Sequence, residues 1–101
     1  MDKIKRDIIS GKLKPNEKLL PVRELSLKLK VNPNTLQKAL SELEDLKLIY
    51  TERTNGKYVT SDIKLIEKER NKEAKKLTDN YINAMKSLGM NEKELKEYMK
   101  G

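Results

Sequence analysis

Apolar residues recur at intervals of three and four along the first part of the chain, the spacing that gathers side chains on one face of a helix. Ile4, Ile8 and Ile9 share one side of a first short helix, and Gly11 follows as a residue typical of helix ends. A polar turn then leads to a second helix, predicted from about Pro21 to Lys30. The chain therefore begins with two short amphipathic helices.

A third helix follows, and its first turn is unusually polar. In the stretch VNPNTLQKAL, Asn32 is predicted as the N-cap and Pro33 as the first helical residue. The helix runs to about Leu46 or Lys47, with its apolar side made of Leu36, Ala39, Leu40, Leu43 and Leu46. Only about three residues separate it from the second helix, as in a tight helix-turn-helix.

After the third helix the pattern changes to short extended runs. The segments LIYTER and KYVTS indicate two strands, and the TNG between them supplies the Asn-Gly pair typical of a hairpin. We expect a two-stranded hairpin from about Leu48 to Ser61. Three helices followed by such a hairpin form the winged variant of the helix-turn-helix.

A different pattern begins at about Asp62. A narrow apolar stripe predicts one long helix that Gly89 ends, and Asn91 and Glu94 then form a capping box for a last helix. Two helices this thin cannot bury both apolar sides alone, so a second copy of the chain is the simplest surface to cover them. The residues expected at this dimer interface are Ile66, Ala74, Leu77, Tyr81, Met85, Leu88, Leu95, Tyr98 and Met99.

Together these patterns predict a mainly α fold with a small β-hairpin. Residues 1–61 are expected to form a winged helix-turn-helix DNA-binding domain, and residues 62–101 a C-terminal helical hairpin that serves for dimerisation. A chain of 101 residues has room for one modest core besides such an appendage.

The net charge of the chain indicates which chemical class of partner it binds. Lys and Arg number 23 against 16 Asp and Glu, a net charge of +7, which favours a polyanion such as nucleic acid or an anionic membrane surface. Residues 1–61 hold 13 basic and 8 acidic residues, a net of +5, whereas residues 62–101 hold 10 and 8. The excess therefore lies mainly in the predicted winged domain.

The composition also excludes several classes of function. Without Cys or His, the chain lacks thiol nucleophiles, imidazole bases and the usual soft metal ligands, and we expect no enzyme activity, metal or cofactor. No apolar run approaches the roughly 20 residues of a membrane span, and the first residues lack a signal-peptide apolar region. We therefore expect no membrane partner and a cytoplasmic location.

The exposed side of the third helix carries the candidate DNA contacts. Asn34 and Thr35 add side-chain donors to a helix N-terminus, which is a natural place for a DNA phosphate. Gln37, Lys38 and Ser41 lie on the same side as Asn34, and Gln and Lys can pair with adenine and guanine in the major groove. The alternatives are capping alone at the helix start and an ordinary solvated face beyond it.

Three more basic residues have candidate roles outside that helix. Arg23 lies at a helix start, where a cation opposes the helix dipole, which indicates contact with a phosphate or a guanine. An ion pair with a neighbouring carboxylate is the alternative. Arg53 and Lys57 flank the hairpin tip, where a wing meets the minor groove or the backbone. Their alternative role is solubility of an exposed hairpin.

The run PVRELSLKLKVNPNTLQKALSELEDLKLIYTERTNGKYV resembles the winged helix-turn-helix of the GntR family of bacterial transcription regulators. The resemblance lies in the order of an Arg-Glu-Leu helix, an Asn-Pro-x-Thr helix start, a Leu-Glu helix end, a Leu-Ile strand and a Gly-containing wing. The short C-terminal part resembles the YtrA-like subfamily, in which small C-terminal helices serve in dimerisation. The two resemblances together cover nearly the whole chain.

The resemblance implies roles for individual residues. Arg23 and Gln37 would face base edges or nearby backbone, Thr35 and Lys38 would hold phosphates, and Gly56 would let the wing approach the minor groove. The chain departs from the family pattern in three places. Leu19, Leu20 and Pro21 occupy the places of the usual Leu-Pro-Ser, whose Ser would contact a phosphate. Lys47 replaces the Gly that closes the recognition helix, and Thr54 replaces the first wing Gly.

The family resemblance further implies a homodimer on a pseudo-palindromic operator in double-stranded DNA, usually acting as a repressor. The C-terminal helices offer little space for a ligand pocket, so we expect no dedicated effector domain and place any small-molecule effector at the dimer interface. Two alternatives remain open from the residues alone. One is a sequence-nonspecific architectural nucleic-acid-binding protein, and the other is a protein-interaction module whose charge only confers solubility.

Overall fold

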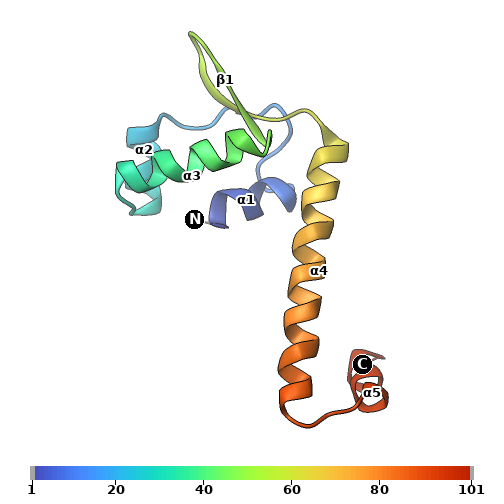
Figure 1. Cartoon of the computed structure of the whole chain (residues 1–101). Coiled ribbons are helices and arrows are strands. Elements are labelled where there is room, and N and C mark those ends of the chain that lie inside the picture. Colours follow the sequence, from blue (N-terminus) through green and yellow to red (C-terminus); the bar gives the residue numbers. More distant parts are fainter. Residues whose placement is uncertain (1, 101) are drawn as a thin grey trace. The chain divides into compact units, whose positions relative to one another are not determined.

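The computed structural model describes residues 2–100 and has three helices, a hairpin and two further helices in chain order (Figure 1). The elements are α1 (Asp2–Ile9), α2 (Val22–Leu29), α3 (Pro33–Asp45), β1 (Ile49–Glu52), β2 (Gly56–Val59), α4 (Ile63–Ser87) and α5 (Glu92–Lys100). This order confirms the predicted winged helix-turn-helix followed by two helices. The chain divides into two compact units, one up to Glu69 and the other from Arg70 on.

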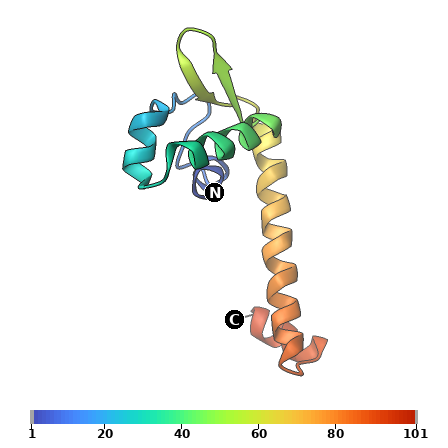
Figure 2. The same ribbon diagram turned by 60° about the vertical axis from the view of Figure 1, so that its left-hand side comes forward.

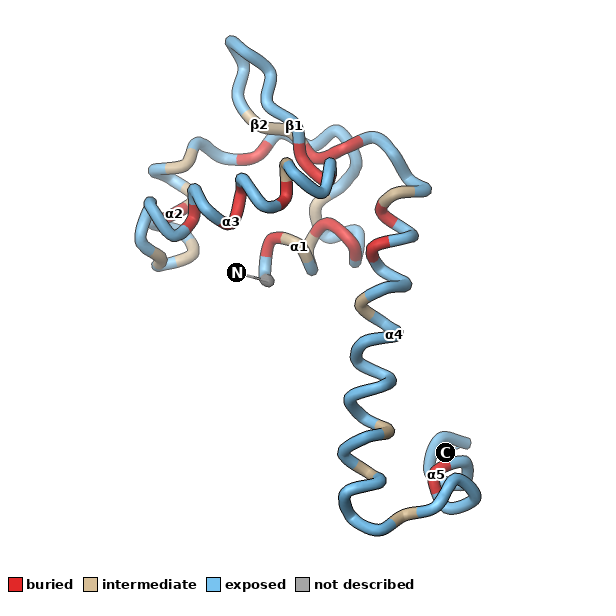
Figure 3. The backbone as a smooth tube through the Cα atoms, in the orientation of Figure 1, coloured by how far each residue is buried: buried red, intermediate tan, exposed pale blue. Residues whose placement is uncertain are grey.

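The core of the first unit joins α1, α3, the hairpin and the start of α4. Its most deeply buried side chains are Ile8, Leu36, Leu40, Leu48, Ile49 and Val59. Figure 3 shows buried stretches on α1, on α3 and at the base of the hairpin. Ile66 of α4 belongs to the same cluster, and nearby the Lys5 ammonium lies 3.7 Å from the buried carboxylate of Glu69. The first two turns of α4 are therefore part of the winged unit.

The turn between α2 and α3 is closed by backbone hydrogen bonds. Lys30 adopts a left-handed conformation at φ 57°, and the N–H of Val31 donates to the carbonyl of Ser26 at 3.0 Å. Two residues further, the side-chain oxygen of Asn32 accepts from the N–H of Asn34 at 2.8 Å. The predicted N-cap is confirmed, and the cap satisfies one of the N–H groups that a helix start leaves free.

The end of α3 also depends on a left-handed residue. Lys47 has φ 67°, and the next N–H, that of Leu48, reaches back to the carbonyl of Leu43 at 3.0 Å. Glycine is the residue that adopts this conformation at least cost. Lys47 thus retains the backbone geometry of a glycine helix end while carrying a side chain.

The hairpin pairs β1 with β2 in antiparallel register, with Ile49 opposite Val59 and Glu52 opposite Gly56. Gly56 is therefore the first residue of β2 instead of a turn residue, and the turn consists of residues 53–55. Figures 1 and 2 show the hairpin projecting away from the three helices that precede it. Two tyrosines, Tyr50 and Tyr58, stack across the pair with their ring centroids 5.6 Å apart.

A third extended segment covers the outer edge of β2. The N–H of Val59 donates to the carbonyl of Glu17 at 2.9 Å, and the N–H of Leu19 donates to the carbonyl of Lys57 at 2.8 Å. The sequence predicted only a polar turn here, because this pairing joins residues about 40 positions apart and leaves no local pattern. The segment protects a strand edge that would otherwise be open.

The second unit contains the rest of α4 and α5. Gly89 follows α4 at φ 83°, which agrees with the predicted end of the long helix. Asn91 and Glu94 form the predicted capping box: the Glu94 N–H donates to the Asn91 side chain at 2.9 Å, and the Asn91 N–H donates to Glu94 at 3.4 Å. Across residues 2–100, no helix is both long and apolar enough to cross a membrane.

The left-handed residue at the end of α3 makes a testable prediction. Lys47→Gly should raise the free energy of unfolding by about 1 kcal/mol, because glycine removes the Cβ strain of a positive φ. Lys47→Ala is the matched control, since it removes the same charged side chain and keeps the strain. Urea unfolding of both variants measures the difference, and equal stability of the two would contradict the strain argument.

Candidate nucleic-acid interface

The apolar side of α3 determines which residues its other side presents. Leu36, Ala39, Leu40 and Leu43 are buried in the first unit. The five candidate residues of this helix are exposed together on the opposite side, namely Asn34, Thr35, Gln37, Lys38 and Ser41. The separation of the two sides agrees with the periodicity of the sequence, since residues three and four apart share a face.

The start of α3 is electrostatically suited to an anion. No acidic residue occupies its first turn, so the positive end of the helix dipole has no carboxylate beside it there. The Asn32 side chain already uses the N–H of Asn34, whereas the side chains of Asn34 and Thr35 remain exposed. Capping therefore uses the side chain of Asn32 and leaves those of Asn34 and Thr35 exposed at the same helix start.

Arg23 lies exposed in the first turn of α2. Its carbonyl accepts a hydrogen bond from the Ser26 hydroxyl at 2.8 Å, which secures the backbone of this turn. Within residues 2–100 its guanidinium has no ion-pair partner, although Glu24 is adjacent in sequence. The alternative role as an intrachain ion pair therefore finds no support here, and the cation remains available for an external anion.

The wing presents two further candidates, Arg53 and Gly56. Arg53 is exposed in the turn. Gly56 has φ 110°, a backbone conformation that residues with a side chain rarely adopt. Any residue with a Cβ would therefore be strained at this position. Glycine at this position is explained by the backbone geometry of the wing itself, whether or not the wing approaches DNA.

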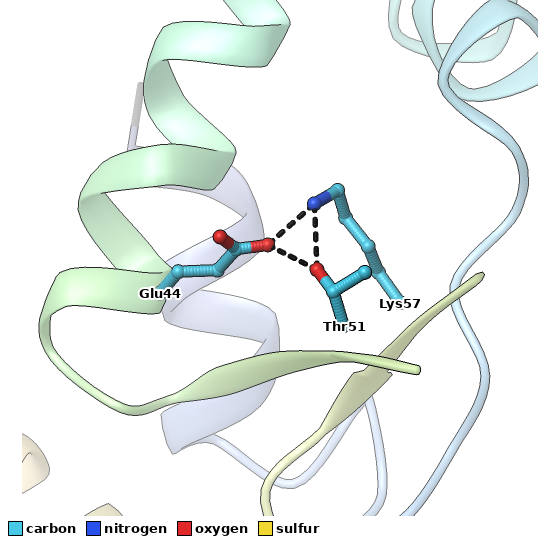
Figure 4. Close-up of polar contacts among 3 residues, drawn as sticks. All are labelled: Glu44, Thr51 and Lys57. Carbon is cyan, nitrogen blue, oxygen red and sulfur yellow. Dashed lines mark hydrogen bonds and ion pairs between the residues drawn. The ribbon is translucent and has the colours of Figure 1, made fainter. Parts of the chain in front are cut away.

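Lys57 joins the wing to α3 (Figure 4). Its ammonium donates to a carboxylate oxygen of Glu44 and to the hydroxyl oxygen of Thr51 at 2.9 Å. The Thr51 hydroxyl donates in turn to the same Glu44 oxygen at 2.5 Å. Three side chains from α3, β1 and β2 thus close one small polar cluster, the Glu44 cluster.

The Glu44 cluster lowers the pKa of the Glu44 carboxyl group. The hydrogen bond from Lys57 holds the pKa of Glu44 below its ordinary value, with smaller contributions from the Thr51 hydroxyl and the Lys57 charge. Partial burial opposes this shift, but it is the weaker effect. Glu44 is therefore ionised and paired at neutral pH, and it offsets the charge of Lys57 in this conformation.

Glu44 is a residue that sequence reasoning missed. It is 13 positions from Lys57 and lies on a different element, so neither helical nor strand periodicity connects them. Lys57 was predicted to contact DNA, and in this structure its ammonium faces the carboxylate of α3. The DNA role of Lys57 stays a prediction, now in competition with an observed structural role.

The candidate dimer residues fall into two groups. Most are exposed or half-buried on α4, on α5 or, for Leu88, in the turn between them, with exposed fractions of 74% for Leu88 and 66% for Tyr98. These residues are Ala74, Leu77, Tyr81, Met85, Leu88, Tyr98 and Met99. Ile66 and Leu95 are buried at 8% and 4%. Ile66 belongs to the core of the winged unit, because the start of α4 packs there, so its apolar surface is already covered within one chain.

Comparison with known proteins bears on this geometry. The profile described as "Bacterial regulatory proteins, gntR family" matches residues 1–59, the part that contains the three helices and the hairpin. The chain belongs to the GntR family. GntR-family proteins are DNA-binding transcription regulators and not enzymes, which confirms the predicted class of function.

Individual relatives extend the similarity beyond the winged domain. An uncharacterised HTH-type transcriptional regulator of Bacillus subtilis (strain 168), YhcF, is 31% identical over 99 residues, which is 98% of this chain and 82% of that protein. The HTH-type transcriptional repressor YtrA of the same strain is 39% identical over 64 residues, 63% of this chain and 49% of that protein.

Two solved structures are similar to this chain over nearly its whole length. A GntR family transcriptional regulator from Listeria monocytogenes is 45% identical, with a TM-score of 0.88 over 96% of this chain and 85% of that one. A transcriptional regulator from Oenococcus oeni is 31% identical, with a TM-score of 0.77 over 98% of this chain and 82% of that one. The C-terminal helices of this GntR-family chain are therefore also found in relatives.

The Glu44 cluster predicts a specific pH dependence. Because the folded-state pKa of Glu44 is lowered, its contribution to stability is present above the ordinary glutamate pKa and is lost as pH falls through the lowered value. The stability difference between wild type and Glu44→Gln should therefore be constant near neutral pH and shrink in the acid range. Urea unfolding at a series of pH values measures it.

Glu42→Gln is the control for this prediction, since it removes the same charge from the same helix without removing a contact to the wing. A stability difference for Glu44→Gln that persists unchanged into acid would show that the carboxylate's charge does not contribute.

Proposed function

We propose that the chain is a homodimeric repressor that recognises a pseudo-palindromic operator in double-stranded DNA. The observation that carries this proposal is the exposed side of α3, where Gln37 and Lys38 lie beside the polar helix start. Gln can pair bidentately with adenine, and Lys can reach guanine or phosphate in the major groove. Arg23 and Arg53, on α2 and in the wing, add exposed cations to the same domain.

The residues divide by chemistry into readers and anchors. Gln37 and Arg23 have side chains that suit base edges, and Ser41 extends the Gln37 side of α3. Asn34, Thr35 and Lys38 suit phosphates, since they surround a helix start with short donors and a cation. Arg53 and Gly56 would bring the wing to the minor groove, where a basic side chain is favoured.

A second copy of the chain is the proposed partner of α4 and α5. Leu77 and Tyr81 leave large apolar surfaces exposed on one side of α4, Leu88 does so just after its end, and Tyr98 and Met99 do so on α5. A symmetric pair of such helices can cover these surfaces with its own copy. The dimer would present two α3 helices to successive major grooves about one helical turn, ~34 Å, apart.

The repressor role rests on a relative. YtrA, which is named a repressor, matches 64 residues, which are 63% of this chain and 49% of YtrA. A regulator that occupies an operator blocks transcription by the simplest means, which is steric. We place the protein in the cytoplasm with the DNA it binds. We place any small-molecule effector at the dimer interface, because the hollow of about 320 Å³ between α4 and α5 is at the lower end of ligand-pocket volumes.

The alternative within nucleic-acid binding is an architectural protein without sequence preference. Both functions depend on phosphate contacts, so salt dependence alone does not distinguish them. The decisive experiment is selection of bound sequences from random duplex DNA at about 150 mM salt, where screening is physiological. A two-fold related motif with half-sites roughly ten base pairs apart would support the operator. Binding without an enriched motif would overturn it in favour of the architectural function.

Two substitutions on α3 test the division between reading and anchoring. Gln37→Ala should cost about 1 to 3 kcal/mol on duplexes that retain one particular base pair and nothing on duplexes that lack it. Lys38→Ala should weaken binding to every duplex by a similar factor and flatten the salt dependence. Titration of both variants against single-base operator variants measures this, and a uniform loss for Gln37→Ala would contradict base reading.

The apolar side of α4 makes a separate prediction for the dimer. Leu77→Gln should raise the dimer dissociation constant by at least about tenfold, because each chain loses a leucine worth about 1.5 to 3 kcal/mol on burial. Lys75→Gln, about 200° away around the helix, should leave it unchanged. Sedimentation of both variants across a concentration series measures the constants, and equal dissociation would place the interface elsewhere.

A further inference from the structure

A groove of about 320 Å³ lies between the wing and the start of α2. Residues 18–22 form one wall and residues 51–57 form the other. The charged side chains that line it are Lys18, Glu52, Arg53 and Lys57. Neither the helix-turn-helix nor the hairpin contains Lys18, which precedes both and was not among the candidate DNA contacts.

The backbone of Lys18 is fixed against the wing. Lys18 pairs with Tyr58 in an isolated antiparallel bridge, and its two neighbours, Glu17 and Leu19, hydrogen-bond to Val59 and Lys57 of β2. Leu19 is buried at 7%, so in this extended segment the adjacent Lys18 side chain is directed outward. The position of Lys18 is thus set by β2, although the segment lies outside the hairpin.

The side chain of Lys18 passes over Gly56. Its Cε atom is 3.5 Å from the point that a Cβ on Gly56 would occupy, which is van der Waals distance. The aliphatic part of a lysine can lie on such a surface while its ammonium stays in water. The Lys18 side chain therefore lies against the wing at Gly56, at a distance that ordinary van der Waals contact allows, and its backbone pairing with β2 keeps it beside the wing.

The charges along the groove differ in availability. The Lys57 ammonium is bound to Glu44, and the Glu52 carboxylate accepts from the Asn55 amide at 3.5 Å. Lys18 and Arg53 have no ion-pair partner within the described part of the chain. Two free cations at the wing therefore outnumber the single groove carboxylate, which favours an anionic occupant.

We propose that Lys18 binds a phosphate of the DNA backbone where the duplex passes across this groove, together with Arg53. The inference rests on the proposed DNA complex and adds to it a contact from the segment before α2. A phosphate contact positions the duplex without reading its sequence. Lys18 would thereby assume the wing's phosphate-binding role that Lys57 cannot fill while it is paired with Glu44.

The test compares Lys18→Gln with wild type in salt titrations of affinity, on the selected operator and on an unrelated duplex. Each phosphate contact contributes about 0.9 to the slope of log affinity against log salt. We expect the slope to fall by that amount and affinity at 0.15 M salt to fall about fivefold on both duplexes. Lys18→Arg should restore both values because it retains the cation.

Lys28→Gln is the matched control, since Lys28 is an exposed lysine of α2 that does not line the groove. Equal slopes for Lys18→Gln and Lys28→Gln would overturn the inference, because the effect would then reflect net charge alone. A loss confined to one sequence would overturn it as well. If the selection finds no operator while Lys18→Gln still flattens the slope on random duplexes, the operator proposal fails and the Lys18 contact stands.

Discussion

The burial of one side of α3 is the constraint on which the rest of the winged domain depends. Leu36 and Leu40 are almost completely enclosed, and they share their core with Ile8 of α1 and with Leu48 and Val59 around the hairpin. Burial of the apolar side chains fixes the rotation of the helix about its axis. The same rotation determines which residues are exposed on the other side. Core packing thus selects which polar residues of α3 are exposed, and with them the set available to DNA in the proposed complex.

The wing is connected to this core in two ways that differ in kind. Apolar packing of Ile49 and Val59 holds the base of the hairpin, whereas the Glu44 cluster ties its edge to the last turn of α3 through charge. The cluster is partly open to solvent, so its strength depends on screening more than the packing does. The side chain of Glu44 thereby connects α3 to both strands of the wing.

What the sequence predicted well was local, and what it missed was not. The Asn32 cap, the two sides of α3 and the Asn91–Glu94 box follow from residues within four positions of one another, where spacing alone determines contact. The pairing of Glu17 with Val59 and the Glu44–Lys57 bond join segments far apart in the sequence, and the spacing of residues does not predict such contacts. The spacing of apolar residues also gave no sign that Ile66 differs from the rest of the α4 stripe. In the structure Ile66 is part of the core of the winged unit, which covers the first turns of α4.

The stacked tyrosines of the hairpin have a spectroscopic consequence. Tyr50 and Tyr58 lie on the strand face opposite the Thr51–Lys57 pair, because successive side chains of a strand alternate. The chain has four tyrosines and neither tryptophan nor phenylalanine, so half of its aromatic chromophores stand in contact on the wing. Near-ultraviolet circular dichroism, usually a global measure of folding, should in this protein report chiefly on the order of a single hairpin.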